Sequence, residues 1–168
     1  MSLDLAPDIQ IDIHVEAGNW AEALPGFEAL CQRAVEAAVS RSGDVSGEVE
    51  VSVLLSDDDA IQVLNRDWRG KDKPTNVLSF PASDDDLLPP GAPVMLGDIA
   101  VALQTTRREA EEMNKPLADH FCHLMVHGML HLLGFDHETE VQADQMEPLE
   151  IEILSGLNIA SPYPDRTA

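Results

Sequence analysis

The chain has 168 residues, of which 44% are hydrophobic and 24% charged, a balance that is typical of one globular domain and excludes a wholly disordered chain. Its net charge of −21 argues against broad nucleic-acid binding, since affinity for phosphate depends on Lys and Arg. The N-terminus has neither the basic start nor the apolar run of a signal peptide, and no segment reaches the roughly 18 apolar residues of a membrane span. We therefore expect a cytoplasmic protein with no membrane partner.

The first half of the chain is predicted to alternate strands and helices. Residues 9–15 and 48–55 alternate apolar and polar side chains, as half-buried strands do. Helical spacing of apolar residues covers 20–40. A second helix is expected over 57–68, with acidic residues in its first turn that suit the helix dipole. A basic loop, 69–75, follows it.

The second half is predicted to contain two strands followed by helices. In chain order we expect a strand over 76–81, an exposed loop over 82–93, a strand over 95–103, an exposed charged helix over 104–113, and helices over 116–133 and 139–156. Pro148 should break or kink the last helix. Residues 159–168 are expected to form a flexible tail. This order of elements predicts a single α+β domain over residues 1–168.

The segment HGMLHLLGFDH, residues 127–137, predicts a metal site. His127 and His131 are four residues apart, so on a helix their side chains lie one turn apart on one face. Gly134 allows a sharp turn that can return His137 as a third ligand. Three imidazoles leave a fourth position open for water, as in catalytic zinc sites, which predicts one Zn²⁺ per chain.

The helix that carries this motif is apolar nearly all round, so it should be buried, where unpartnered imidazoles are costly. His120 and His123 share its histidine face, and each either lines the site, supports a ligand from behind or acts as a capping group. Asp136 could hydrogen-bond a ligand imidazole or cap the following helix. Cys31 and Cys122 are expected to be reduced, buried thiols.

The motif matches the zinc-peptidase pattern except at the position of the general base, where Gly128 replaces the glutamate. Three neutral ligands leave the metal charge uncompensated, which favours an anionic substrate such as a phosphodiester. Arg69 is the candidate catalytic residue that stabilises charge on the phosphate. Lys71 and Lys73 are expected to follow the substrate backbone, and Asn76 contacts substrate or holds loop geometry.

Three ordered motifs resemble the YbeY family of endoribonucleases, which act as rRNA maturation factors. They are HGMLHLLGFDH at 127–137, NRDWRGKDKPTNVLSFP at 65–81, and LGDI at 96–99. The resemblance implies a mixed β-sheet packed with helices, with a zincin-like metal site on a buried helix. It carries the metal ligands over to His127, His131 and His137, and the functionally important arginine to Arg69.

The same resemblance implies a metal-dependent endoribonuclease that is specific for single strands and matures the 3′ end of 16S rRNA. It also implies a role in ribosome quality control. We therefore expect single-stranded RNA, the 16S rRNA precursor and the small ribosomal subunit with its associated proteins as partners, and no DNA. The acidic composition suggests that the ribosome or a partner protein delivers the substrate.

Two other functions remain open from the sequence. One is a zinc hydrolase with a peptidase-like site, and the other is a ribosome-assembly factor whose zinc is structural and whose nuclease activity is weak or conditional. The sequence identifies no general base, so water and the ribose 2′-OH both remain possible nucleophiles.

Overall fold

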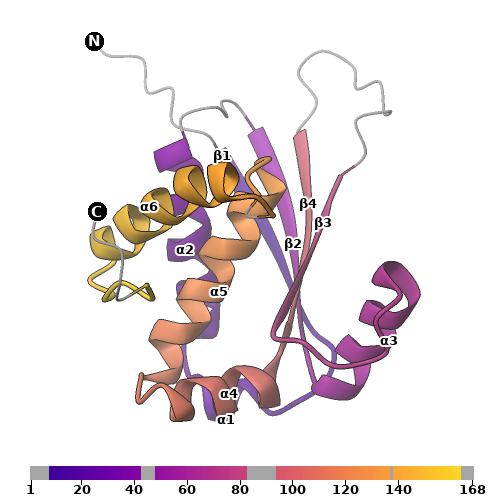
Figure 1. Ribbon diagram of the computed structural model, residues 1–168. Coiled ribbons are helices and arrows are strands. Elements are labelled where there is room, and N and C mark those ends of the chain that lie inside the picture. The colour runs from indigo at the N-terminus through magenta and orange to yellow at the C-terminus, as the bar shows by residue number, and fades with distance from the viewer. Residues whose placement is uncertain (1–7, 43–47, 83–93, 137, 164–168) are drawn as a thin grey trace.

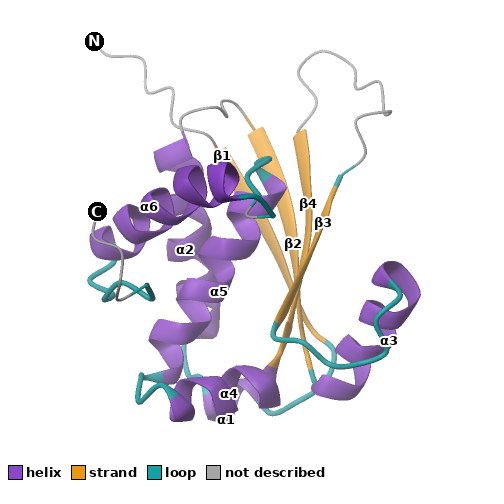
Figure 2. Cartoon of the chain, in the orientation of Figure 1, coloured by secondary structure: helices purple, strands orange, loops and turns teal. Residues whose placement is uncertain are grey.

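A mixed four-stranded sheet organises the computed structural model, which describes residues 8–42, 48–82, 94–136 and 138–163 (Figures 1 and 2). The elements in chain order are β1 (Asp8–Val15), α1 (Trp20–Ala23), α2 (Phe27–Ser42), β2 (Glu48–Ser56), α3 (Asp58–Arg69), β3 (Val77–Pro81), β4 (Val94–Ala102), α4 (Leu103–Glu112), α5 (Leu117–Leu132) and α6 (Glu140–Gly156). The predicted single-domain α+β fold with a mixed sheet is confirmed.

The sheet has the order β1-β2-β4-β3, with three parallel strands and an antiparallel edge strand, β3. A bulge in β4 opposite the Glu50–Val51 step brings Gly97 against β3 with φ +141°. A Cβ at Gly97 would lie 2.3 Å from the carbonyl oxygen of Phe80. Only glycine therefore allows β4 to approach the edge strand this closely.

Helices cover the two faces of the sheet unequally (Figure 1). Alternate residues of a strand point to opposite faces, so Ile99 and Val101 of β4 join the large core under α2 and α5. Ala100 and Ala102 join a smaller core that also contains Ile61 of α3. The edge strand β3 thus lies between the buried helix α5 and the amphipathic helix α3.

Two predicted helices differ from those observed. The helix expected over 20–40 is interrupted at Leu24–Gly26, because Pro25 has no N–H to donate and Gly26 adopts φ +78°. The helix expected to be exposed over 104–113 begins at Leu103 and buries one face, including Thr106 and Ala110.

The C-terminal part of the chain also differs from expectation. α6 continues through Pro148, because Ile151 and Leu154 pack its second half into the core. Ile159 packs on the same core, and the hydroxyl of Tyr163 donates a hydrogen bond to Glu150 over 3.1 Å. Up to Tyr163 the chain is therefore docked on the domain and is not the expected flexible tail, of which residues 164–168 lie outside the described residues.

None of the helices in the described ranges is both long enough and apolar enough to cross a membrane.

Candidate metal centre

Helix α5 carries a continuous row of four histidines on one face. Neighbouring rings lie close together, with centroid distances of 5.9 Å for His120–His123, 6.2 Å for His123–His127 and 4.7 Å for His127–His131. The rest of the helix is buried against the sheet and α2, including the Cys122 thiol, which is free like that of Cys31. The predicted common face of the histidines is confirmed.

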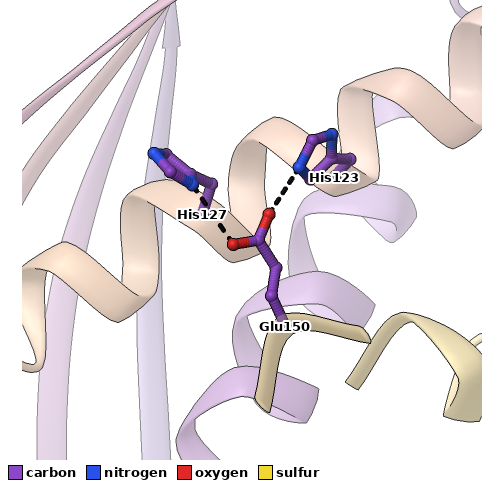
Figure 3. A group of neighbouring side chains, drawn as sticks. All are labelled: His123, His127 and Glu150. Atoms are coloured by element: carbon purple, nitrogen blue, oxygen red, sulfur yellow. Dashed lines mark hydrogen bonds and ion pairs between the residues drawn. The ribbon is translucent and has the colours of Figure 1, made fainter. Parts of the chain in front are cut away.

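Glu150 of α6 lies between two of these rings and is fully buried (Figure 3). Its carboxylate interacts with Nε2 of His123 and, over 3.3 Å, with Nδ1 of His127. Burial raises the pKa of this carboxyl, but the hydrogen bonds from the two histidines outweigh burial and hold the pKa at about 2. The ionised carboxylate can only accept, so each of these ring nitrogens carries a proton.

This arrangement determines which nitrogen of His127 faces outward. Because Nδ1 donates to Glu150, the neutral ring presents the lone pair of Nε2, which lies 3.2 Å from Nε2 of His131. Two nitrogens bound to one tetrahedral Zn²⁺ at about 2.0–2.1 Å are about 3.3 Å apart. The two predicted ligands therefore have the spacing and donor type that a shared zinc ion requires, whereas His137, the third, lies outside the described residues.

A second combination of the same side chains could also hold a metal ion. His123, His127 and Glu150 offer one ligand atom each, all within 4.8 Å of one another. These atoms are already joined by the hydrogen bonds drawn in Figure 3. His123 was predicted to line the site or support a ligand, and it does line the cleft beside His127.

Three of these histidines, His123, His127 and His131, line a cleft of about 660 Å³ between α5 and the edge strand β3. Arg69, at the last residue of α3, lines the same cleft from the other side of β3, together with the strand residues Val77 and Ser79. Gly134 also lines it and ends α5 with φ +101°, as predicted. The cleft thus brings an imidazole pair and a guanidinium together although about 60 residues separate them in the sequence.

The other predicted substrate residues occupy different places. Asn76 lines the cleft, but its side chain donates to Glu109 over 3.0 Å and accepts from the backbone N–H of Val77, so it holds the start of β3. Lys71 and Lys73 are exposed on the loop after α3 and are not among the lining residues of the cleft in the described part of the chain.

Asp136 lines the cleft next to the end of α5. It does not cap the following helix, because the N-cap of α6 is Thr139, which forms a capping box with Gln142. One of the two predicted roles of Asp136 is therefore wrong, and the role beside an imidazole stays a prediction.

Gly128 is explained by packing. A Cβ at this position would lie 3.2 Å from Oγ of Ser79 and 3.3 Å from the side chain of Ile99. A larger side chain would therefore collide with β3 and β4, and the glutamate of a zinc peptidase has no space here.

A family model described as endoribonuclease YbeY matches residues 14–158. The chain belongs to this family. Endoribonuclease YbeY of Paramagnetospirillum magneticum is 49% identical over 157 residues, which cover 92% of this chain and 96% of that protein. Endoribonuclease YbeY of a Rhodopseudomonas palustris strain is 51% identical over 152 residues, which cover 90% of this chain and 80% of that protein. The solution structure of TM1509 from Thermotoga maritima has a TM-score of 0.53 at 26% identity, covering 95% of this chain and all of that one.

Membership of the YbeY family supports an endoribonuclease role for this chain, that of a hydrolase acting on RNA. Two residues of the site, Glu150 and Tyr163, were not predicted from the sequence. Helical spacing could have identified Glu150 as a buried charge. It follows Met146 by four residues and precedes Leu154 by four, so it lies on the apolar face of α6. No sequence pattern could have identified Tyr163, because it comes after the last helix in a Pro-rich segment.

Proposed function

We propose that this chain is a zinc-dependent endoribonuclease that cleaves single-stranded RNA, matures the 3′ end of 16S rRNA in the cytoplasm and takes part in ribosome quality control. The observation that carries the proposal is the cleft in which the Nε2 atoms of His127 and His131 lie 3.2 Å apart and face the same space as Arg69. An imidazole pair suits a divalent ion, and a guanidinium suits a phosphodiester.

His127 and His131 would hold the ion together with the predicted ligand His137. When bound, the ion supplies a Lewis acid that polarises a phosphoryl oxygen and lowers the pKa of water. Glu150 acts on the ligands and not on the substrate, because its carboxylate is buried behind the histidine row. It keeps the proton of His127 on Nδ1, so that the lone pair of the ring lies on Nε2, the atom that would bind the ion.

Arg69 orients the scissile phosphate. Its planar fork of donors can hold two phosphate oxygens at once, and its charge stabilises the negative charge that develops on them. Among the described residues Arg69 forms no ion pair that would compete with a substrate. Lys71 and Lys73 extend this positive charge along the loop, which supports a substrate that continues past the cleft.

The decisive experiment compares cleavage of a single-stranded RNA by the wild-type protein, Arg69→Ala and His131→Ala, with zinc measured in each preparation. Arg69→Ala should lose cleavage by a factor of about 10² or more while keeping its zinc. His131→Ala should lose both. Arg41→Ala is the matched control, because Arg41 pairs with Glu152 on the surface of α2 and α6. Undiminished cleavage by Arg69→Ala would refute the role of this residue.

Zinc removal separates a catalytic ion from a structural one. The large core under α2 and α5 is built from apolar side chains and does not include the two ligands. Chelation should therefore abolish cleavage while the far-ultraviolet circular dichroism stays that of the folded protein. Unfolding on chelation would instead favour the assembly factor with structural zinc.

A further inference from the structure

Trp68 is the most exposed large apolar side chain in the described part of the chain. It is 72% exposed, whereas the other tryptophan, Trp20, is 1% exposed. Trp68 precedes Arg69, the residue that lines the cleft, in the last turn of α3. The indole is therefore accessible to a ligand that extends past Arg69 out of the cleft.

The position of Trp68 on α3 is one that would normally be buried. It follows Ile61 by seven residues and Asn65 by three, and both of these are buried against the sheet. At Trp68, however, the helix has reached the edge of the sheet, and Phe80 of β3 is the ring it contacts, with centroids 6.0 Å apart and planes tilted by 60°. Phe80 therefore supports the indole from one side, and most of the indole remains accessible.

The loop after Trp68 carries Lys71 and Lys73 and is held in place by hydrogen bonds to α3. The side chain of Asn65 donates to the carbonyl of Lys73 over 2.9 Å, and the carbonyl of Asn65 accepts from the N–H of Lys71. Gln62 donates to the carboxylate of Asp72 in the same loop. Lys71 and Lys73, like Arg69, form no ion pair within the described residues. The loop that follows Trp68 thus carries exposed cations in a chain that is otherwise strongly acidic.

We infer that Trp68 is a stacking platform for an unpaired base of the RNA strand whose phosphate binds at Arg69. This inference rests on the proposed function and names a subsite for it. An aromatic face next to free cations is the combination with which proteins bind single strands without reading sequence. The backbone would cross the edge strand β3 from the histidines to the basic loop. A base in a duplex is stacked on its neighbours, so this subsite favours single strands.

The two tryptophans make the inference directly measurable. Trp20 is buried and reports little on ligands, so quenching of the fluorescence of the zinc-loaded protein by RNA reports on Trp68. The probe is a single-stranded oligoadenylate of about ten nucleotides, compared with an abasic oligomer of the same length. We expect quenching by the oligoadenylate and none by the abasic oligomer, with electrophoresis checking that the probe stays intact.

Affinity is then measured by anisotropy of a labelled probe. Trp68→Ala should bind the oligoadenylate about 5- to 150-fold more weakly, which corresponds to one stacked base, and should bind the abasic oligomer unchanged. Trp68→Phe keeps an aromatic face and should bind within about threefold of wild type. Val63→Ala is the control, because Val63 is a half-exposed apolar residue of the same helix.

The outcomes distinguish this inference from the proposed function. If wild type cuts RNA and Trp68→Ala binds and cuts equally well, the stacking subsite is overturned and the nuclease stands. If wild type binds with quenching of Trp68 but never cuts, the subsite stands and the nuclease fails. Equal loss of affinity for both oligomers in Trp68→Ala would also overturn the inference, since stacking requires a base.

Discussion

Replacing Glu150 by glutamine tests whether the buried carboxylate orients His127, the proposed metal ligand. The carboxylate accepts from His123, His127 and the hydroxyl of Tyr163, and it is fully buried. A glutamine of the same shape offers one oxygen and one NH₂ group, so at least one ring N–H would face another donor. If that ring is His127, it must rotate or move its proton to Nε2, the nitrogen that is to bind the metal.

The expected loss can be bounded in two ways. Removing the partner of a metal-ligating histidine typically weakens metal binding by about 10- to 100-fold, or about 1.4–2.8 kcal/mol. One hydrogen bond to a charged group contributes about 1.5–3 kcal/mol, which agrees with that range. We therefore expect Glu150→Gln to bind zinc about 10- to 100-fold more weakly than wild type.

The assay is competition for zinc with a chromophoric chelator, well below the unfolding temperature of either protein. Glu152→Gln is the matched control, since it removes another carboxylate from the same helix. The side chain of Glu152 is 55% exposed and pairs with Arg41. Zinc affinity of Glu150→Gln within about threefold of wild type would refute the orienting role. A loss far beyond 100-fold would show instead that Glu150 is a direct ligand, in the alternative group with His123 and His127.

Three further predictions follow from packing and burial. Gly128→Glu creates the complete peptidase signature. It should lower the free energy of unfolding, measured by heat or urea, by about 1–3 kcal/mol or more, because a Cβ at this position would already lie 3.2 Å from a side chain of β3. The variant should not cleave casein, since the glutamate has no space in which to act as a general base. Gly97→Ala should lower the free energy of unfolding further, because its Cβ would lie 2.3 Å from a backbone carbonyl oxygen. Gly156→Ala is the control and should change the unfolding midpoint little, because its Cβ would meet only an arginine side chain at 3.5 Å. Burial raises the pKa of Cys31 to about 12 and that of Cys122 to about 11, so mass spectrometry should find neither thiol alkylated by iodoacetamide at pH 8 until denaturant is added.

Much of the fold could be predicted because local patterns and tertiary packing agree in most segments. The strands at 9–15 and 48–55 alternate as predicted and are found as β1 and β2. Asp57 caps α3 by accepting from the N–H of Ala60, and Gly70 ends it in a left-handed conformation, both of which suit the predicted boundaries. Pro148 shows the opposite case, in which burial of the rest of α6 overrides a local signal to break the helix.

Spacing alone predicted the arrangement of site residues only where they are neighbours in the sequence. The spacing of His127 and His131 places them on one face of a helix, whatever the fold around them. Glu150, by contrast, meets His127 only because α6 packs against α5, and no local pattern specifies that pairing. Arg69 was predicted as a candidate residue, but its convergence on the same cleft depends on β3 being the edge strand beside β4, which no local pattern specifies.

The two helices beside β3 differ in burial, and this explains why the charges of the site are divided between them. The histidines of α5 are at least partly buried, so their rings must be neutral, hydrogen-bonded or bound to a cation, and Glu150 meets that requirement. The end of α3 is exposed, so Arg69 and its basic neighbours can remain charged without a protein partner. Of these two helices, α3 is therefore the one that presents fixed positive charge to a polyanion, and cleavage as proposed requires that the polyanion also reach the imidazoles across the edge strand. The net charge of −21 opposes the approach of RNA to the chain as a whole, so we expect an RNA strand to bind first at the exposed cations that end α3.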